Sequence, residues 1–206
     1  MNRIRTLTRR AALGVATAAV ALVLAACGDG GAAGPGAGGA GRHAAAHNAQ
    51  DVAFAQGMIP HHRQALEMAR LADGRASSGA VEDLARRIEK GQDPEIRTMT
   101  GWLTSWGEEA PGAAAGGGHH SGTSHAGMPG MMSDGDLAGL ERITGKAFDA
   151  AFLTLMVKHH EGAVDMAGTE RAEGRYGPAR AMADAIVTAQ KAEIAEMKRL
   201  LADGGR

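Results

Sequence analysis

Two copies of one sixteen-residue pattern constrain the fold of this chain more than any other feature. Residues 54–69 read FAQGMIPHHRQALEMA and residues 152–167 read FLTLMVKHHEGAVDMA, 98 positions later. Both fit Phe-x3-Met-x2-His-His-x2-Ala-x2-Met-Ala, and the same offset relates a second pattern, Gln-x2-Glu-Ile-x2-Met, at 92–99 and 190–197. Ungapped self-similarity of this extent indicates duplication of one supersecondary unit.

Each copy is typical of a hairpin of two amphipathic helices. At about 100° per residue, the shared residues of the first pattern fall within an arc about 120° wide, the width of a core-facing stripe. The first helix is expected to end near Leu71, before Asp73-Gly74, and the second to begin near Ala80 with Ser77-Ser78 as its cap. Gly177-Pro178 separates the matching helices of the second copy. Two such hairpins predict an all-α, ferritin-like four-helix bundle.

Two prolines modify this prediction for the first copy. Pro60 is expected to kink the first helix, and Pro94 to interrupt the second, with Asp93 as a fresh cap. The second copy has Lys158 and Ala192 at these positions, so its helices are expected to be straighter.

The first 26 residues have the features of an export signal. A basic start, MNRIRTLTRR, precedes an apolar run of about sixteen residues, shorter than the ~20 that a spanning helix needs. The run closes with LAAC, residues 24–27, which resembles a bacterial lipobox and implies cleavage before Cys27 and lipid attachment to its sulfur. An ordinary signal peptide cut nearby is the alternative, and Arg9-Arg10 leaves both the Sec and the Tat route open. The mature protein is expected to be exported and anchored to the cell envelope.

Removal of residues 1–26 also limits the chemistry of the mature chain. It takes away four arginines and no acid, so the formal charge changes from −1 to −5, and nucleic acid is not an expected partner. Cys27 is the single cysteine, and once acylated it can form neither a disulfide nor a thiolate–metal bond.

Composition divides the mature chain into four segments. Residues 27–48 are Gly/Ala-rich and predict a flexible tether, 49–106 the first hairpin, 107–136 a Gly/His/Met-rich linker, and 137–206 the second hairpin. The linker has a composition that suits metal capture, although a solvated linker with incidental His and Met explains it equally simply. Its candidate ligands are His119, His120, His125, Met128, Met131 and Met132.

The repeated stripe turns polar side chains toward the core, where they are costly unless paired. Four histidines in one interior repel one another when charged, and when neutral each needs partners for two ring nitrogens. A metal ion takes one nitrogen and leaves the other N–H for a carboxylate or amide partner; a purely hydrogen-bonded polar core is the alternative. The candidate metal ligands are Met58, His61, His62, Met68, Met156, His159, His160 and Met166, and their candidate second-layer partners are Gln92, Glu95, Gln190 and Glu193.

Imidazole and thioether ligands without cysteine favour copper. Thioether suits Cu(I), and imidazole accepts Cu(I) or Cu(II), whereas iron and zinc remain as alternatives that gain little from methionine. Because the ligands must be deprotonated, binding is expected to weaken as the pH falls through about 6.5, the pKa of an unperturbed histidine.

The repeated M-x2-HH-x2-A-x2-MA frame, with the later Q-x2-EI-x2-M, resembles the ferritin-like family catalogued as domain of unknown function 305. Its members include CopM-type periplasmic copper-binding proteins. The resemblance covers 49–106 and 137–203, and it implies a four-helix bundle, an exported location and, for some members, copper binding and tolerance through Met and His. It implies nothing about the 107–136 linker.

Three functions are compatible with these features. The leading hypothesis is a lipid-anchored copper-binding protein without enzymatic turnover that buffers or sequesters the ion. The second is a ferritin-like di-iron oxidase or ferroxidase, which usually needs four carboxylates; the candidate acids are Glu95 and Glu193, joined by Glu67 and Asp165. The third is a non-metal interaction module of the envelope. The sequence leaves open whether the hairpins pack within one chain or form a homo-oligomer.

Overall fold

The computed structural model describes residues 46–112 and 127–204. The predicted signal peptide, Cys27 and the linker histidines His119, His120 and His125 lie outside the described residues. The described part contains helices and no strand, which confirms the all-α prediction. Its helices are α1 (Ala49–Arg70), α2 (Gly79–Trp106), α3 (Asp134–Glu141), α4 (Gly145–Glu173) and α5 (Gly177–Gly204).

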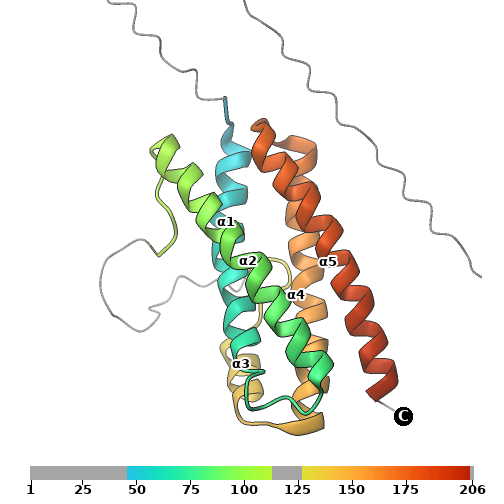
Figure 1. Ribbon diagram of the computed structural model, residues 1–206. Coiled ribbons are helices and arrows are strands. Elements are labelled where there is room, and N and C mark those ends of the chain that lie inside the picture. Colours follow the sequence, from blue (N-terminus) through green and yellow to red (C-terminus); the bar gives the residue numbers. More distant parts are fainter. Residues whose placement is uncertain (1–45, 113–126, 205–206) are drawn as a thin grey trace, which may run out of the picture. The chain divides into compact units, whose positions relative to one another are not determined.

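The four long helices contact one another in pairs. In Figure 1, α2 lies along α1 and α5 lies along α4, and α1 also packs against α4. The start of α1 meets the end of α4, because the Asp51 carboxylate accepts hydrogen bonds from the backbone N–H groups of Arg175 and Tyr176. The segments that carry the two histidine pairs therefore lie side by side.

The ends of the helices are held partly as the sequence predicts. A capping box of Asn48 and Asp51 begins α1. Ser78 occupies the N-cap position of α2, but its side chain makes no capping hydrogen bond, so the predicted cap is wrong in this detail. Ser77 instead donates its hydroxyl and its backbone N–H to Asp149 of α4. A tertiary contact thus takes the place of a local one.

The predicted interruption of the second helix is also wrong. α2 runs unbroken from Gly79 to Trp106 through Pro94, and Asp93 lies within it, paired with Arg97 rather than acting as a cap. Pro94 and the residue four positions earlier, Lys90, are both exposed, so water can satisfy the carbonyl that proline leaves unpaired. α1 likewise continues through Pro60.

A layer of buried polar side chains divides the apolar core. On each long helix, buried hydrophobic residues on one side of the layer pack in one cluster and most of those on the other side pack in a second. The layer consists of His61, His62, Gln92, His159, His160 and Gln190. Because buried polar groups without partners are costly, this layer is where a functional site is expected.

None of the described helices is both long enough and apolar enough to cross a membrane.

Candidate metal centre

The four repeated histidines are completely buried and form an inner and an outer pair. His61 of α1 and His159 of α4 are the inner pair: their ring centroids are 3.9 Å apart, with 41° between the ring planes. His62 and His160, the next residue on each helix, point instead toward α2 and α5. This division follows from the helix geometry, since consecutive residues differ by about 100° in direction.

The ring nitrogens of the inner pair are largely without partners. His61 Nε2 lies 3.0 Å from the carbonyl oxygen of Pro129, which can only accept, so this nitrogen carries the proton. His61 Nδ1 is then a lone-pair donor, and no described group bonds to it. Neither nitrogen of His159 has a described partner. Unsatisfied nitrogens in a buried position are what an imidazole–metal site requires of its ligands.

Burial keeps the inner pair neutral. It lowers the pKa of His61 to about 4, an effect reinforced by His62 and His160 and opposed by the Pro129 carbonyl. The pKa of His159 is also lowered well below its usual value, first by burial and then by the neighbouring histidines. Competition between protons and a metal ion for these two rings, which the sequence placed near pH 6.5, is therefore expected at lower pH.

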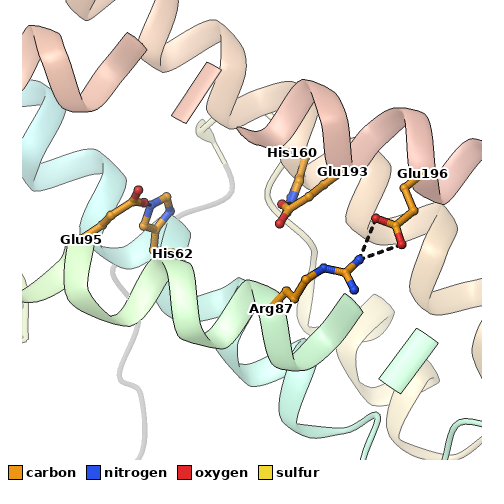
Figure 2. Close-up of polar contacts among 6 residues, drawn as sticks. All are labelled: His62, Arg87, Glu95, His160, Glu193 and Glu196. Atoms are coloured by element: carbon orange, nitrogen blue, oxygen red, sulfur yellow. Dashed lines mark hydrogen bonds and ion pairs between the residues drawn. The ribbon is translucent and has the colours of Figure 1, made fainter. Parts of the chain in front are cut away.

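The outer pair makes the same contact twice. His62 Nε2 lies 2.7 Å from a carboxylate oxygen of Glu95, and His160 Nε2 lies 2.7 Å from one of Glu193 (Figure 2). Each glutamate side chain is 20–25% exposed, while each histidine is fully buried. Nδ1 of both histidines has no described partner. Glu95 and Glu193 thus lie where second-layer partners of a metal ligand would lie.

The two glutamines of the layer do not act as hydrogen-bond partners of the histidines, the role that the sequence predicted for them. Neither amide atom of Gln92 has a hydrogen-bond partner among the described residues, and the same holds for Oε1 of Gln190. Both side chains are buried, at 4% and 3% exposure. The structure therefore buries both glutamines but gives no hydrogen bond from them to the histidines of the described residues.

The four repeated methionines are distributed over both sides of the layer. Met58, Met68 and Met156 are fully buried, Met58 in one apolar cluster and the other two in the second. Met166 is partly buried against the first cluster. The structure thus shows these four side chains packing in the core, and only Met166 combines that packing with partial exposure.

The end of the linker covers the inner histidine pair, a contact that the sequence did not indicate. The strap, as we call residues 128–132, lies between α1 and α4. Gln64 holds it by donating to the carbonyl of Met132 and accepting from its N–H, at 3.0 and 2.7 Å. Met132 is buried, whereas Met128 and Met131 are partly buried. The sequence predicted residues 107–136 only as a linker, and a Pro-Gly pair such as 129–130 carries no signal for the contact between the Pro129 carbonyl and His61.

The acidic residues do not form a di-iron type of site. Within the described ranges, no three His, Cys, Asp or Glu side chains converge closely enough to hold a metal ion by themselves. Glu67 and Asp165 are exposed, while Glu95 and Glu193 are each bonded to a different histidine. A metal site here would need sulfur or the unpartnered imidazoles of the inner pair.

Comparisons with known proteins identify relatives with the same fold. The sequence profile of the family described as Domain of unknown function (DUF305) matches residues 51–201. A solved DUF305 protein from Streptomyces coelicolor is 32% identical, with a TM-score of 0.67, covering 76% of this chain and 94% of that one. A DUF305 fragment from Deinococcus radiodurans is also 32% identical, with a TM-score of 0.65, covering 76% and 97%.

A third relative has been solved with metal ions. CopM in its Cu(II)-bound form is 30% identical, with a TM-score of 0.62, covering 74% of this chain and 96% of that one. CopM has also been solved in Cu(I)-bound and Ag-bound forms. A search of curated proteins returned no match.

Proposed function

Because the chain belongs to the DUF305 family, we propose that it binds copper outside the cytoplasmic membrane and buffers or sequesters it, with the inner pair His61 and His159 as its principal ligands. The observation that carries this proposal is the burial of two neutral imidazole rings, 3.9 Å apart, with three of their four nitrogens unpartnered among the residues that the structure describes. The metal-bound forms of CopM support the choice of ion.

The donor set fits a soft monovalent ion better than a hard one. Two neutral imidazoles suit Cu(I), and within residues 46–112 and 127–204 no group of carboxylates converges to favour an ion that requires oxygen. Glu95 and Glu193 would orient His62 and His160 as outer members of the same layer. Metal binding would satisfy ring nitrogens that the fold otherwise leaves buried without partners.

The duplication gives this site its architecture. We infer that the four long helices form one bundle of two related hairpins, because the His62–Glu95 contact recurs at His160–Glu193 after a shift of 98 residues in both partners. The inner pair then consists of one histidine from each copy, so the site exists only when both copies pack together.

Titration with copper tests the ligand assignment. We expect the His61→Asn/His159→Asn variant to bind one equivalent of Cu(I) less than the wild-type protein in competition with a chromogenic Cu(I) chelator. His47→Asn is the matched control, since His47 stacks on Trp106 outside the layer. Circular dichroism of both variants checks that they are folded. Unchanged Cu(I) uptake in the folded double variant would remove the inner pair from the proposal.

The location is proposed from the leader sequence. Cleavage before Cys27 and acylation of its sulfur would tether the copper-binding part to the envelope. We expect Cys27→Ser to move the protein from the membrane fraction to the soluble exported fraction. Retention of the variant in the membrane fraction would contradict lipid anchoring while leaving the metal site untouched.

A further inference from the structure

Among the positions at which the first repeat departs from the second, one beside the site makes room for sulfur. Gly57 of α1 aligns with Leu155 of α4 at the offset of 98. A methyl group placed on Gly57 would meet the Met166 Cε atom at 3.0 Å and the Met128 Sδ atom at 3.9 Å. Two thioether side chains, one from α4 and one from the strap, thus occupy the space that a larger residue would fill.

The strap is fitted closely enough to hold Met128 in this place. Its Gly130 has a φ of +76°, and a side chain there would meet the backbone oxygens of Lys158 and His159 at 2.6 and 3.0 Å. Gly162 of α4 lies so close to the strap that a Cβ added to Gly162 would collide with the Pro129 carbonyl. The hydrogen bond from His61 and the two bonds of Gln64 fix the same segment from α1.

Met128 and Met166 also differ in exposure from the three other methionines of the repeated pattern. Both are partly buried, whereas Met58, Met68 and Met156 are completely buried. Gly57 lies one helical turn before His61, so the thioether pair lies next to the inner histidine pair. An ion arriving from solvent would therefore meet the thioethers before it reached the buried rings.

We propose that Met128 and Met166, side by side over Gly57, form an outer docking site for a soft monovalent cation, Cu(I) or Ag(I), adjacent to the buried histidine pair. Thioether sulfur is a neutral, polarisable ligand that selects Cu(I)-like ions over zinc and other harder divalent ions. Transfer of the ion from this docking site to the histidines rests on the proposed function. Binding of the ion by the two methionines does not, because these ligands come from the strap and from α4.

Silver provides a redox-stable probe of this site. We expect titration of methyl-13C-methionine-labelled full-length protein with Ag(I) to shift the Met128 and Met166 methyl signals, assigned from the single Met→Leu variants, whereas Zn(II) leaves them unmoved. The Met128→Leu/Met166→Leu variant should lose about one equivalent of Ag(I). Met99→Leu/Met197→Leu is the matched control, because both residues are fully buried in the apolar clusters.

Two further variants separate this inference from the proposed function. Gly57→Leu copies the residue of the second repeat and should abolish the Met128 and Met166 shifts in a protein that remains folded. The His61→Asn/His159→Asn variant should keep those shifts while losing the inner equivalent. Methyl signals of Met128 and Met166 that stay unmoved by Ag(I) in the wild-type protein overturn the docking site, whatever the histidine variant does.

Discussion

At the scale of single residues, a buried pair of carboxyl groups is the other unusual feature of the molecule. Glu170 of α4 is completely buried, and its pKa is raised to about 8, first by burial and then by the neighbouring Asp51. The pKa of Asp51 is lowered, because hydrogen bonds from the backbone of Asn48, Tyr176 and Arg175 outweigh the effect of burial. Within the described part of the chain, no donor forms a hydrogen bond to either Glu170 oxygen, and with its raised pKa Glu170 keeps its proton at neutral pH beside Asp51.

Glu170 is expected to contribute a loss of stability to the metal-free protein as the pH rises from about 4.5, its ordinary value, to about 8. A carboxyl group with a raised pKa holds its proton more tightly in the folded state, so this contribution is fully present below pH 4.5 and falls by at most about 1.4 kcal/mol per pH unit above it. The buried His61 and His159, whose pKa values are lowered, contribute the opposite slope up to about pH 6.5. Glu170→Gln, which resembles the protonated acid, should remove the Glu170 contribution and leave that of the histidines. Urea denaturation at pH 5.5 and pH 8 measures it, and a wild-type slope unchanged in the variant would contradict the assignment.

At the scale of elements, the strap shows how a loop can complete a site between helices. It supplies the acceptor for His61 and one of the two thioethers over Gly57. Its path depends on the absence of side chains at Gly130 and Gly162, where backbone passes directly over α4. Close backbone contact of this kind tolerates no added volume.

Gly162→Ala is therefore expected to displace the strap. We expect a loss of about 1–3 kcal/mol in unfolding free energy, because the added methyl group would collide with the Pro129 carbonyl and leave His61 Nε2 without its acceptor. Gly168→Ala is the matched control on the same helix, because a Cβ there meets nothing within 4 Å. This substitution should raise the unfolding free energy by about 0.5–1 kcal/mol, since alanine is more stable than glycine within a helix. Equal effects of the two substitutions in urea denaturation would show that the strap does not need this close contact.

At the scale of the whole molecule, each repeat holds the hairpin loop of the other. Asp51 and Asp149 occupy equivalent positions, 98 residues apart. Asp51 accepts from the backbone of Arg175 and Tyr176 between α4 and α5, and Asp149 accepts from the N–H and hydroxyl of Ser77 between α1 and α2. Reciprocal contacts of this kind couple the two hairpins at opposite ends.

The two aspartates are expected to contribute unequally to stability. Asp51→Ala should cost about 2–3 kcal/mol, because the backbone N–H groups of Arg175 and Tyr176 lose an acceptor that is completely buried, whereas Asp149→Ala should cost under about 1 kcal/mol, since water can reach the exposed Ser77. Chemical denaturation of the two variants at the same pH provides the measurement. A larger loss for Asp149→Ala would show that the exposed contact, and not the buried one, controls the docking of the hairpins.

The prediction from sequence succeeded where local pattern is sufficient. Helical periodicity and the repeat placed the long helices and put His61, His62, His159 and His160 in the core, since the period of a helix alone determines which residues share a face. It failed where a distant segment supplies the partner. The Ser77 hydroxyl bonds to Asp149 rather than capping α2, and solvent exposure of Pro94 lets α2 continue.

The sequence by itself determined which side chains the candidate site has to draw on: paired imidazoles, thioethers and two glutamates at a fixed spacing on helical faces. Only the tertiary structure decided which of these meet. Packing of α1 against α4 joined His61 to His159, left His62 and His160 to separate glutamates, and brought the strap over the inner pair. The physical reason is that a helix fixes directions around its own axis, whereas distances between side chains of different helices depend on how closely the backbones approach. The approach of the strap to α4 depends in the same way on Gly130 and Gly162, where backbone meets backbone.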